Sequence, residues 1–155
     1  METQNKPVSF RLVKIQTEQF ATFDGVFNNQ KEVEVLTDAS YGANIEGKTI
    51  FCKISHNFKN IEGNTFIKIA LTCIFEIQPA DWTRIISEDK TVLTLPKDLC
   101  IHMAMLAIGT ARGVLHAKTE GTAFNIHVLP TINTLEMIPG DLTINLTPDN
   151  HGQTS

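Results

Sequence analysis

The stretch TIFCKISHNFKNIEGNTFIKIALTCIFEI, residues 49–77, decides the fold of this chain. Apolar side chains recur at every second position in both halves of it, which is the period of a β-strand with one buried face. Residues 60–64, Asn-Ile-Glu-Gly-Asn, separate the halves, and Gly63 suits the positive φ that a short hairpin loop requires. We therefore expect two long strands, residues 49–60 and 64–77, that form an antiparallel hairpin.

Two earlier segments are also predicted to be extended. The sequence VSFRLVKI, residues 8–15, alternates until both sides become apolar near its end. The sequence EVEVL, residues 32–36, alternates cleanly and places Val33 and Val35 on one face. Together with the hairpin, these segments predict a four-stranded antiparallel sheet of the meander type, with one strongly apolar face and one mixed face.

The longest predicted element is a helix from Pro96 to about Glu120. Pro96 stands where a first helical turn tolerates proline, and Gly121 follows the helix, where a glycine in the left-handed region is common. The connector before this helix, residues 81–94, carries Trp82 among other apolar residues. We therefore expect this connector to pack against the rest of the domain.

The end of the chain is predicted to hold two short elements. Residues 134–138 begin a second helix, which the Pro139–Gly140 pair stops within about two turns. Residues 142–146 alternate as a strand does, and residues 147–155 read as a flexible polar tail. The fold class is therefore α+β, with a single domain over residues 1–146.

The first half of the predicted long helix is apolar nearly all round. A sheet covers only one side of a helix, and in a chain of 155 residues the other side is most simply covered by a second copy. The sequence therefore predicts an oligomer. The apolar side chains expected at its interface are Leu99, Ile101, Met103, Met105, Leu106 and Ile108.

Composition and charge exclude several classes of function. A net charge of −4 offers no clustered cations for binding a nucleic acid. The N-terminal residues contain no readable secretory signal, and no stretch approaches the ~18 consecutive apolar residues of a membrane span. The three cysteines, Cys52, Cys73 and Cys100, stand in apolar patterns. They indicate a reducing, cytoplasmic compartment, where Cys52 and Cys73 are expected to pack rather than to form a disulfide.

No catalytic, metal or cofactor motif is found, so we expect a protein that is not an enzyme. The G-x-S-x-G, Walker, G-x-G-x-x-G and H-E-x-x-H patterns are all missing, and the five histidines share no metal-ligand spacing with the cysteines. His56 is interpreted as a half-buried, hydrogen-bonded side chain, and His102 as an interface histidine. A small-ligand enzyme of the hot-dog type is a remote alternative. Such chains form their helix before most of the sheet, whereas here the predicted strands precede the helix.

The remaining apolar side chains predict a groove. Some stand on the mixed face of the expected sheet, and others stand in the segment after Gly121. An apolar segment beside an incompletely covered sheet face makes a groove that binds peptides by hydrophobic burial, although the same residues could simply complete the core. The groove candidates are Val33, Val35, Phe51, Phe66, Ile74, Leu129, Ile132, Leu135 and Ile138.

Over nearly its whole length, the chain resembles the SecB export chaperone and its SecB-like relatives. FRLVKIQTEQFATFD, residues 10–24, is similar to the first strand of that family, and KEVEVL, residues 31–36, to its second. The stretch of residues 49–77 is similar to its long hairpin. LCIHMAMLAIGTARGVLHAKTEGTAFNIHVLPTIN, residues 99–133, resembles its tetramer-forming helix and the Leu-Pro turn that follows.

The resemblance implies a four-stranded antiparallel sheet with helices on one side, assembled as a dimer of dimers through the long helix. It adds Arg112 to the residues expected at the oligomer interface. It implies an ATP-independent holdase that binds unfolded polypeptides in hydrophobic grooves, in protein export or in toxin–antitoxin control. The alternative is a binding module dedicated to a single partner, such as an antitoxin. In SecB, acidic side chains dock the export motor SecA, and Asp24 keeps one match to them. The Pro139–Gly140 pair departs from the family, because it shortens the second helix.

Overall fold

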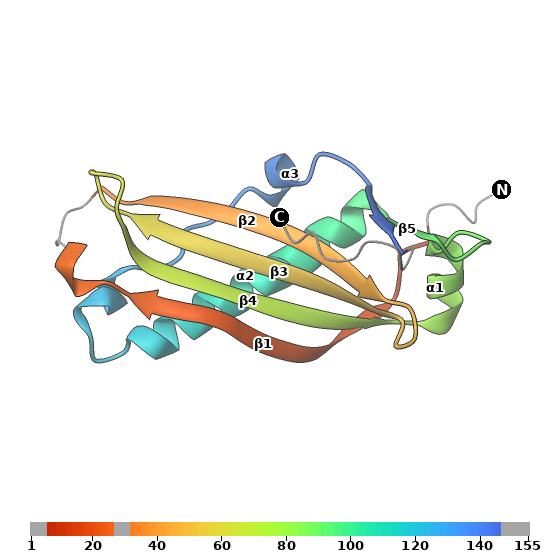
Figure 1. Ribbon diagram of the computed structural model, residues 1–155, viewed down its shortest axis with the longest axis horizontal. Coiled ribbons are helices and arrows are strands. Elements are labelled where there is room, and N and C mark those ends of the chain that lie inside the picture. The colour runs from red at the N-terminus through yellow and green to blue at the C-terminus, as the bar shows by residue number, and fades with distance from the viewer. Residues whose placement is uncertain (1–5, 27–31, 147–155) are drawn as a thin grey trace.

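The computed structural model describes residues 6–26 and 32–146. The predicted tail of residues 147–155 therefore lies outside the described residues. In chain order, the elements are β1 (Phe10–Thr22), η2 (Asp24–Val26), β2 (Glu34–Asn44), β3 (Thr49–Lys59), β4 (Thr65–Ile77), α1 (Pro79–Ile85), β5 (Val92–Leu95), α2 (Lys97–Thr119), η3 (Ala123–Ile126), α3 (Thr134–Met137) and β6 (Leu142–Asn145). The α+β fold predicted from the sequence is confirmed (Figure 1).

The main sheet has four antiparallel strands in the order β1-β4-β3-β2. The strands β2, β3 and β4 form the expected meander, but β1 crosses over to pair with β4, with Phe10 opposite Ile77. This order places β4 in the interior of the sheet, which suits a strand with eight buried residues among its thirteen. Gly63 has the expected positive φ of 83° in the β3–β4 loop.

The second strand is longer than its alternation predicted. It runs from Glu34 to Asn44, whereas the clear apolar pattern ends at Leu36. Residues 37–44, TDASYGAN, have little intrinsic strand propensity. They are extended because each pairs with a residue of β3, as Tyr41 does with Cys52. Tertiary pairing therefore overrides the local preference of this segment.

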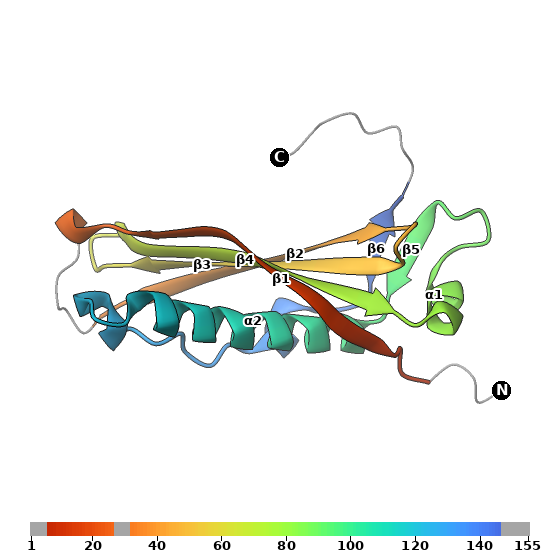
Figure 2. The ribbon, with the colours of Figure 1, turned by 90° about the horizontal axis from the view of Figure 1, so that it is seen from below.

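One face of the sheet is covered and the other is bare of helices (Figure 2). The inner face carries the alternating side chains of β3 and β4, including Ile54 and Leu71, which stand opposite each other and are fully buried. The helix α2 packs against this face with ten buried residues of its own. By length and composition alone, α2 could cross a membrane, but the same composition suits a helix that is buried against a sheet.

After α2, the chain turns back along the helix. Gly121 has a φ of 78°, as expected at a helix end. Residues 122–141, which we call the returning segment, then run beside α2 in the same layer to reach β6 (Figures 1 and 2). There β6 pairs with β5 in a separate two-stranded sheet. Near this end of the molecule, Trp82 of α1 is buried, so the prediction that the connector packs down is confirmed.

The returning segment corrects the predicted oligomer interface. Four of the six apolar residues expected there are buried within the chain itself, because the sheet covers one flank of α2 and the returning segment covers another. These four are Leu99, Ile101, Met103 and Ile108. Met105 and Leu106 remain exposed, by 57% and 39%. Arg112 is half-buried and donates to the carbonyl oxygens of Leu129 and Pro130 in its own chain.

We expect Leu71→Ala to destabilise the fold by about 2–5 kcal/mol, since Leu71 is fully buried and truncation leaves a cavity between the sheet and α2. Urea unfolding followed by circular dichroism measures this loss. Leu36→Ala is the matched control, because Leu36 is 40% exposed in the same sheet and should cost clearly less. Equal losses for the two variants would contradict the assignment of the inner face.

Candidate functional site

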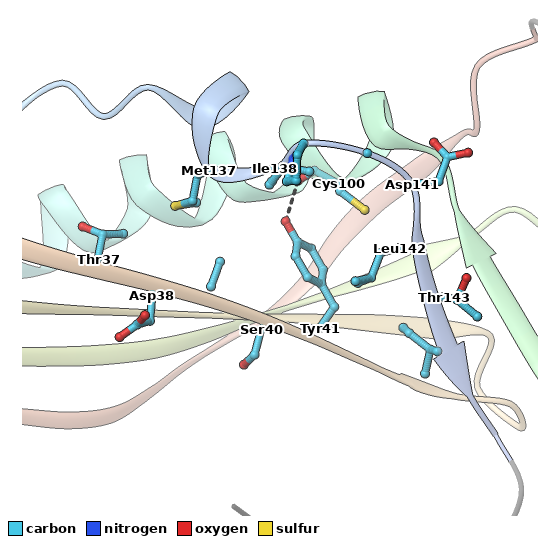
Figure 3. Close-up of a pocket in the computed structure, with 14 residues that line it drawn as sticks. Thr37, Asp38, Ser40, Tyr41, Cys100, Met137, Ile138, Asp141, Leu142 and Thr143 are labelled. Atoms are coloured by element: carbon cyan, nitrogen blue, oxygen red, sulfur yellow. Dashed lines mark hydrogen bonds between the residues drawn. The ribbon is translucent and has the colours of Figure 1, made fainter.

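A cavity of about 890 Å³ lies between the edge of the main sheet and the returning segment. Its walls are residues 37–41 of β2, Cys100 of α2 and residues 137–144, and we call it the trough (Figure 3). Five consecutive residues of β2 line it, so the trough follows the backbone of the strand and does not merely touch alternate side chains. The apolar part of its lining includes Ala39, Ile138 and Leu142.

The trough continues along β2 toward the β2–β3 turn. A second cavity of about 640 Å³ is lined by residues 42–46 and 144–146, and it shares Ile144 with the trough. Residues 37–46 of β2 and of the turn after it therefore border the two cavities without interruption. At about 3.3 Å per residue, the extended part of this stretch, residues 37–44 of β2, is about 25 Å long.

The strand beside the trough has a free edge. Within the described part of the chain, β2 pairs only with β3 and forms the end of the main sheet. An edge strand presents unpaired backbone N–H and C=O groups, which a further extended segment can bond. An apolar cavity along such an edge adds space for the side chains of that segment. This arrangement has the geometry to bind an extended polypeptide.

Tyr41 connects the two walls of the trough. It extends from β2 toward the helix layer, where its hydroxyl donates a 2.7 Å hydrogen bond to the carbonyl oxygen of Cys100 (Figure 3). Burial raises the pKa of the phenol above its usual range and that of the Cys100 thiol to about 11. Both groups are therefore neutral at physiological pH, so Tyr41 serves as a hydrogen-bonded tether and Cys100 as an apolar wall.

The charge around the trough has one sign. Asp38 and Asp141 line the trough and Glu46 lines its continuation. None of the described residues that line these two cavities is lysine, arginine or histidine. One of the carboxylates already has a partner, since Asp141 accepts a 2.7 Å hydrogen bond from the backbone N–H of Lys97. The rim is therefore acidic, and it disfavours anionic ligands.

The predicted groove residues are not gathered in one place. Only Ile138 lines the trough. Phe51 and Ile74 line a depression of about 400 Å³ on the bare face of the sheet, away from the returning segment. Of the rest, Leu129 is buried and Leu135 is 64% exposed. Partly buried against the core are Val33, Val35 and Ile132.

Phe66 lies on the opposite side of the sheet from its expected position. The register shifts between Phe58 and Lys59, so that Phe66 is an extra residue in a β-bulge. Its ring stands 6.3 Å from Phe58 and 5.0 Å from His127, and it is buried. Strict alternation assigned Phe66 to the mixed face, and a bulge breaks alternation by one residue.

The residues that do form the trough were identified only in part. Tyr41 and Ala39 continue the alternation of Val33 and Val35, so extending the strand beyond Leu36 would have found them. The extended character of residues 142–146 was predicted, but its place beside β2 was not. Cys100 carries no sequence signal that distinguishes it from the other buried residues of α2.

Other predicted residues have mixed outcomes. Cys52 and Cys73 stand opposite each other as expected, and both are buried and free, so the prediction of packing without a disulfide is confirmed. His56 is fully buried rather than half-buried, and only one of its ring nitrogens has a hydrogen-bond partner. His102 is exposed and packs edge-on against Phe10. Asp24 is an exposed carboxylate just beyond β1, and its docking role stays a prediction.

Comparison with known proteins relates the fold to one chaperone. No protein-family model matches the chain, and no curated protein is significantly similar in sequence. Among solved structures, the chain is similar to the SecB-like chaperone Rv1957 of Mycobacterium tuberculosis, solved with a ChAD peptide from the HigA1 antitoxin Rv1956. The TM-score is 0.50 at 12% identity, covering 80% of this chain and 91% of that one. A Streptococcus agalactiae protein of unknown function matches at a TM-score of 0.37 and 11% identity, over 83% of this chain and 99% of that one. The chain therefore has a SecB-like fold.

We expect Tyr41→Phe to lower the free energy of unfolding by about 1 kcal/mol, because it removes the hydrogen bond that joins β2 to the start of α2. Urea denaturation measures the change. The control is Thr83→Val, which removes a hydroxyl-to-carbonyl bond to Pro79 within the exposed part of α1 and should cost less than about 0.5 kcal/mol. A loss no larger than that of the control would contradict a tethering role for Tyr41.

Proposed function

We propose that this protein is an ATP-independent chaperone that holds extended segments of non-native polypeptide in the trough beside β2. Three observations support the proposal. The fold is SecB-like, the sequence has no nucleotide-binding motif, and a free strand edge of the main sheet borders an apolar cavity of about 890 Å³. The free edge beside the cavity carries the argument, because it offers two kinds of interaction to any sequence that can extend.

Backbone bonding and side-chain burial divide the task of binding. The β2 edge bonds N–H and C=O groups, which every polypeptide has, so it does not select a sequence. The side chains that point into the trough meet apolar groups such as Ile138 and Leu142, where each buried aliphatic side chain contributes about 1.5–3 kcal/mol. A protein with these properties binds unfolded apolar segments broadly and releases them once they fold.

The acidic rim indicates which clients bind best. Asp38, Asp141 and Glu46 stand along the trough and its continuation with no cationic side chain among the lining residues. Cationic apolar segments are therefore favoured over anionic ones, and added salt weakens this preference. Working in the cytoplasm, such a chaperone serves protein export or toxin–antitoxin control. If the chaperone serves protein export, we propose in addition that Asp24 takes part in docking a SecA-type motor.

We expect the protein, at stoichiometric amounts, to suppress light scattering by lysozyme reduced with dithiothreitol, a cationic aggregating client. Reduced α-lactalbumin, which is anionic, should be suppressed less at low salt. With Leu142→Asp, the concentration of the protein needed for suppression should rise at least about tenfold, because the variant places a charge in the apolar wall. The thermal unfolding of this variant is measured alongside, to establish that it is folded.

The matched control is Ile61→Asp. Ile61 is 64% exposed in the β3–β4 turn, outside both cavities, so the same chemical change should leave suppression unaltered. Suppression by neither client, or equal losses in the two variants, would contradict binding in the trough.

A second candidate function is a module dedicated to one partner. It is favoured by the structural neighbour, which was solved with an antitoxin peptide. Affinity purification of the tagged chain from its own cells distinguishes the two: many co-purifying unfolded proteins support the holdase, whereas one stoichiometric partner supports the dedicated module. Both candidates use the trough, and they differ only in how many sequences enter it.

We also propose that the chain assembles with copies of itself, as a dimer of dimers, through the flank where α2 borders β1. Ring contacts place the helix beside this strand at both ends, with His102 on Phe10 at 5.0 Å and the Lys118 ammonium over Phe20 at 5.5 Å. Along both elements, exposed apolar residues lie in sequence between these contacts. They are Leu12, Val13 and Ile15 of β1 and Met105 and Leu106 of α2.

We expect Leu106→Asp to reduce the mass measured by size-exclusion chromatography with light scattering toward the 17.2 kDa of one chain, because a charge on this flank opposes its burial. Ile61→Asp serves again as the control and should leave the mass unchanged. A wild-type chain that already elutes as a monomer, or a variant with the wild-type mass, would contradict the proposed interface.

A further inference from the structure

The inner face of the sheet contains one buried polar side chain with an incomplete set of hydrogen bonds. His56 of β3 is fully buried. Its Nδ1 shares a 2.8 Å hydrogen bond with the hydroxyl of Thr37, a residue that lines the trough. Its Nε2 is also buried and has no hydrogen-bond partner among the described residues. A neutral imidazole tolerates this position, but an imidazolium has two N–H donors and a charge that burial leaves uncompensated.

The charged group that acts on His56 has the wrong sign to stabilise an imidazolium. The positive charge of Arg112 on α2 disfavours protonation of His56 across the interface between helix and sheet. Burial first, and then Arg112, lower the pKa of His56 from 6.5 to about 4. The electrostatic neighbours of His56 include no carboxylate that could offset this effect.

The other groups around His56 do not supply a counter-charge either. Its register partners are Thr37 on β2 and Ile69 on β4, which are uncharged. On the returning segment, His127 packs on the rings of Phe58 and Phe66, and burial lowers its pKa as well. The groups named on β2, β4 and the returning segment therefore offer an imidazolium no negative charge.

The same arginine fastens the returning segment. Arg112 donates from Nε to the carbonyl oxygen of Leu129, at 2.9 Å, and from Nη2 to that of Pro130, at 3.0 Å. These two bonds hold the start of the stretch that leads through α3 to residues 137–144, the outer wall of the trough. Arg112 is only half-buried, so its guanidinium has a path to water when a neighbouring cation repels it.

We propose that protonation of His56 displaces Arg112 from the Leu129 and Pro130 carbonyl groups, and that this releases residues 127–138 of the returning segment, which end at the trough, in acid. The release of the returning segment does not depend on the proposed function. Only its consequence, faster exchange of clients at low pH, rests on the proposed function.

The direction of the effect follows from linkage. In the open form His56 meets water and regains its ordinary pKa of 6.5, whereas in the closed form it stays neutral until about pH 4. Between these values the open form binds a proton that the closed form does not, so opening becomes more favourable as the pH falls from 6.5 toward 4. From pH 7.5 to pH 5, the opening equilibrium is expected to rise roughly 30-fold.

Hydrogen exchange followed by mass spectrometry measures the opening of the returning segment in the chain without any client. The result therefore does not depend on chaperone activity. After correction for the intrinsic effect of pH, fragments within residues 127–138 should lose protection by roughly 30-fold at pH 5, while fragments of β3 and β4 stay protected. His56→Gln, which does not titrate, should remove the larger part of this dependence, and His127→Gln, which removes the other imidazole with a lowered pKa, should remove a smaller part.

Three results would overturn the inference. One is equal loss of protection in β3, β4 and residues 127–138, which would mean global unfolding. Another is an unchanged pH dependence in His56→Gln. If that variant does not fold, NMR titration of the histidine ring carbons in the wild-type protein replaces it. A His56 that titrates near pH 6.5 in the closed protein would then overturn the inference.

Discussion

Burial of the inner faces of β3 and β4 under α2 is the constraint from which the rest of the structure follows. The side chains that meet there, such as Ile54, Leu71 and Met103, are fully buried. A single helix layer covers only one side of a sheet. The other face and the outer edges are therefore left free of helices, and the remaining chain has only the flank of α2 to pack against. The returning segment takes that flank.

This arrangement explains why the trough lies where it does. The returning segment packs beside α2 and then turns up to β6, so it passes the edge of β2 without pairing with it. Tyr41 joins β2 to α2 by one hydrogen bond. The space between β2 and the returning segment is bounded by the free edge of β2 on one side and apolar side chains on the other. The proposed binding of polypeptide rests on these two properties.

The middle of the returning segment is held by fewer hydrogen bonds than the strands of the main sheet. Those strands are joined along their whole length, whereas Leu129 and Pro130 are bonded to α2 through the Arg112 side chain. An element held by few bonds opens at a lower free energy than the core does. In the proposed opening, the buried His56 makes this step depend on pH, because the charged group that acts on it among the described residues is the Arg112 cation.

The sequence by itself determined the β3–β4 hairpin, the ends of α2 near Pro96 and Gly121, and the α+β class, because these depend on local periodicity and on the conformations that proline and glycine favour. It did not determine that β1 pairs with β4, that a bulge moves Phe66 to the inner face, or that residues 137–144 stand opposite β2. Only the tertiary structure decided these, since each depends on which distant segments compete for the same apolar surface. A groove is a relation between such segments, and no single stretch of sequence carries it.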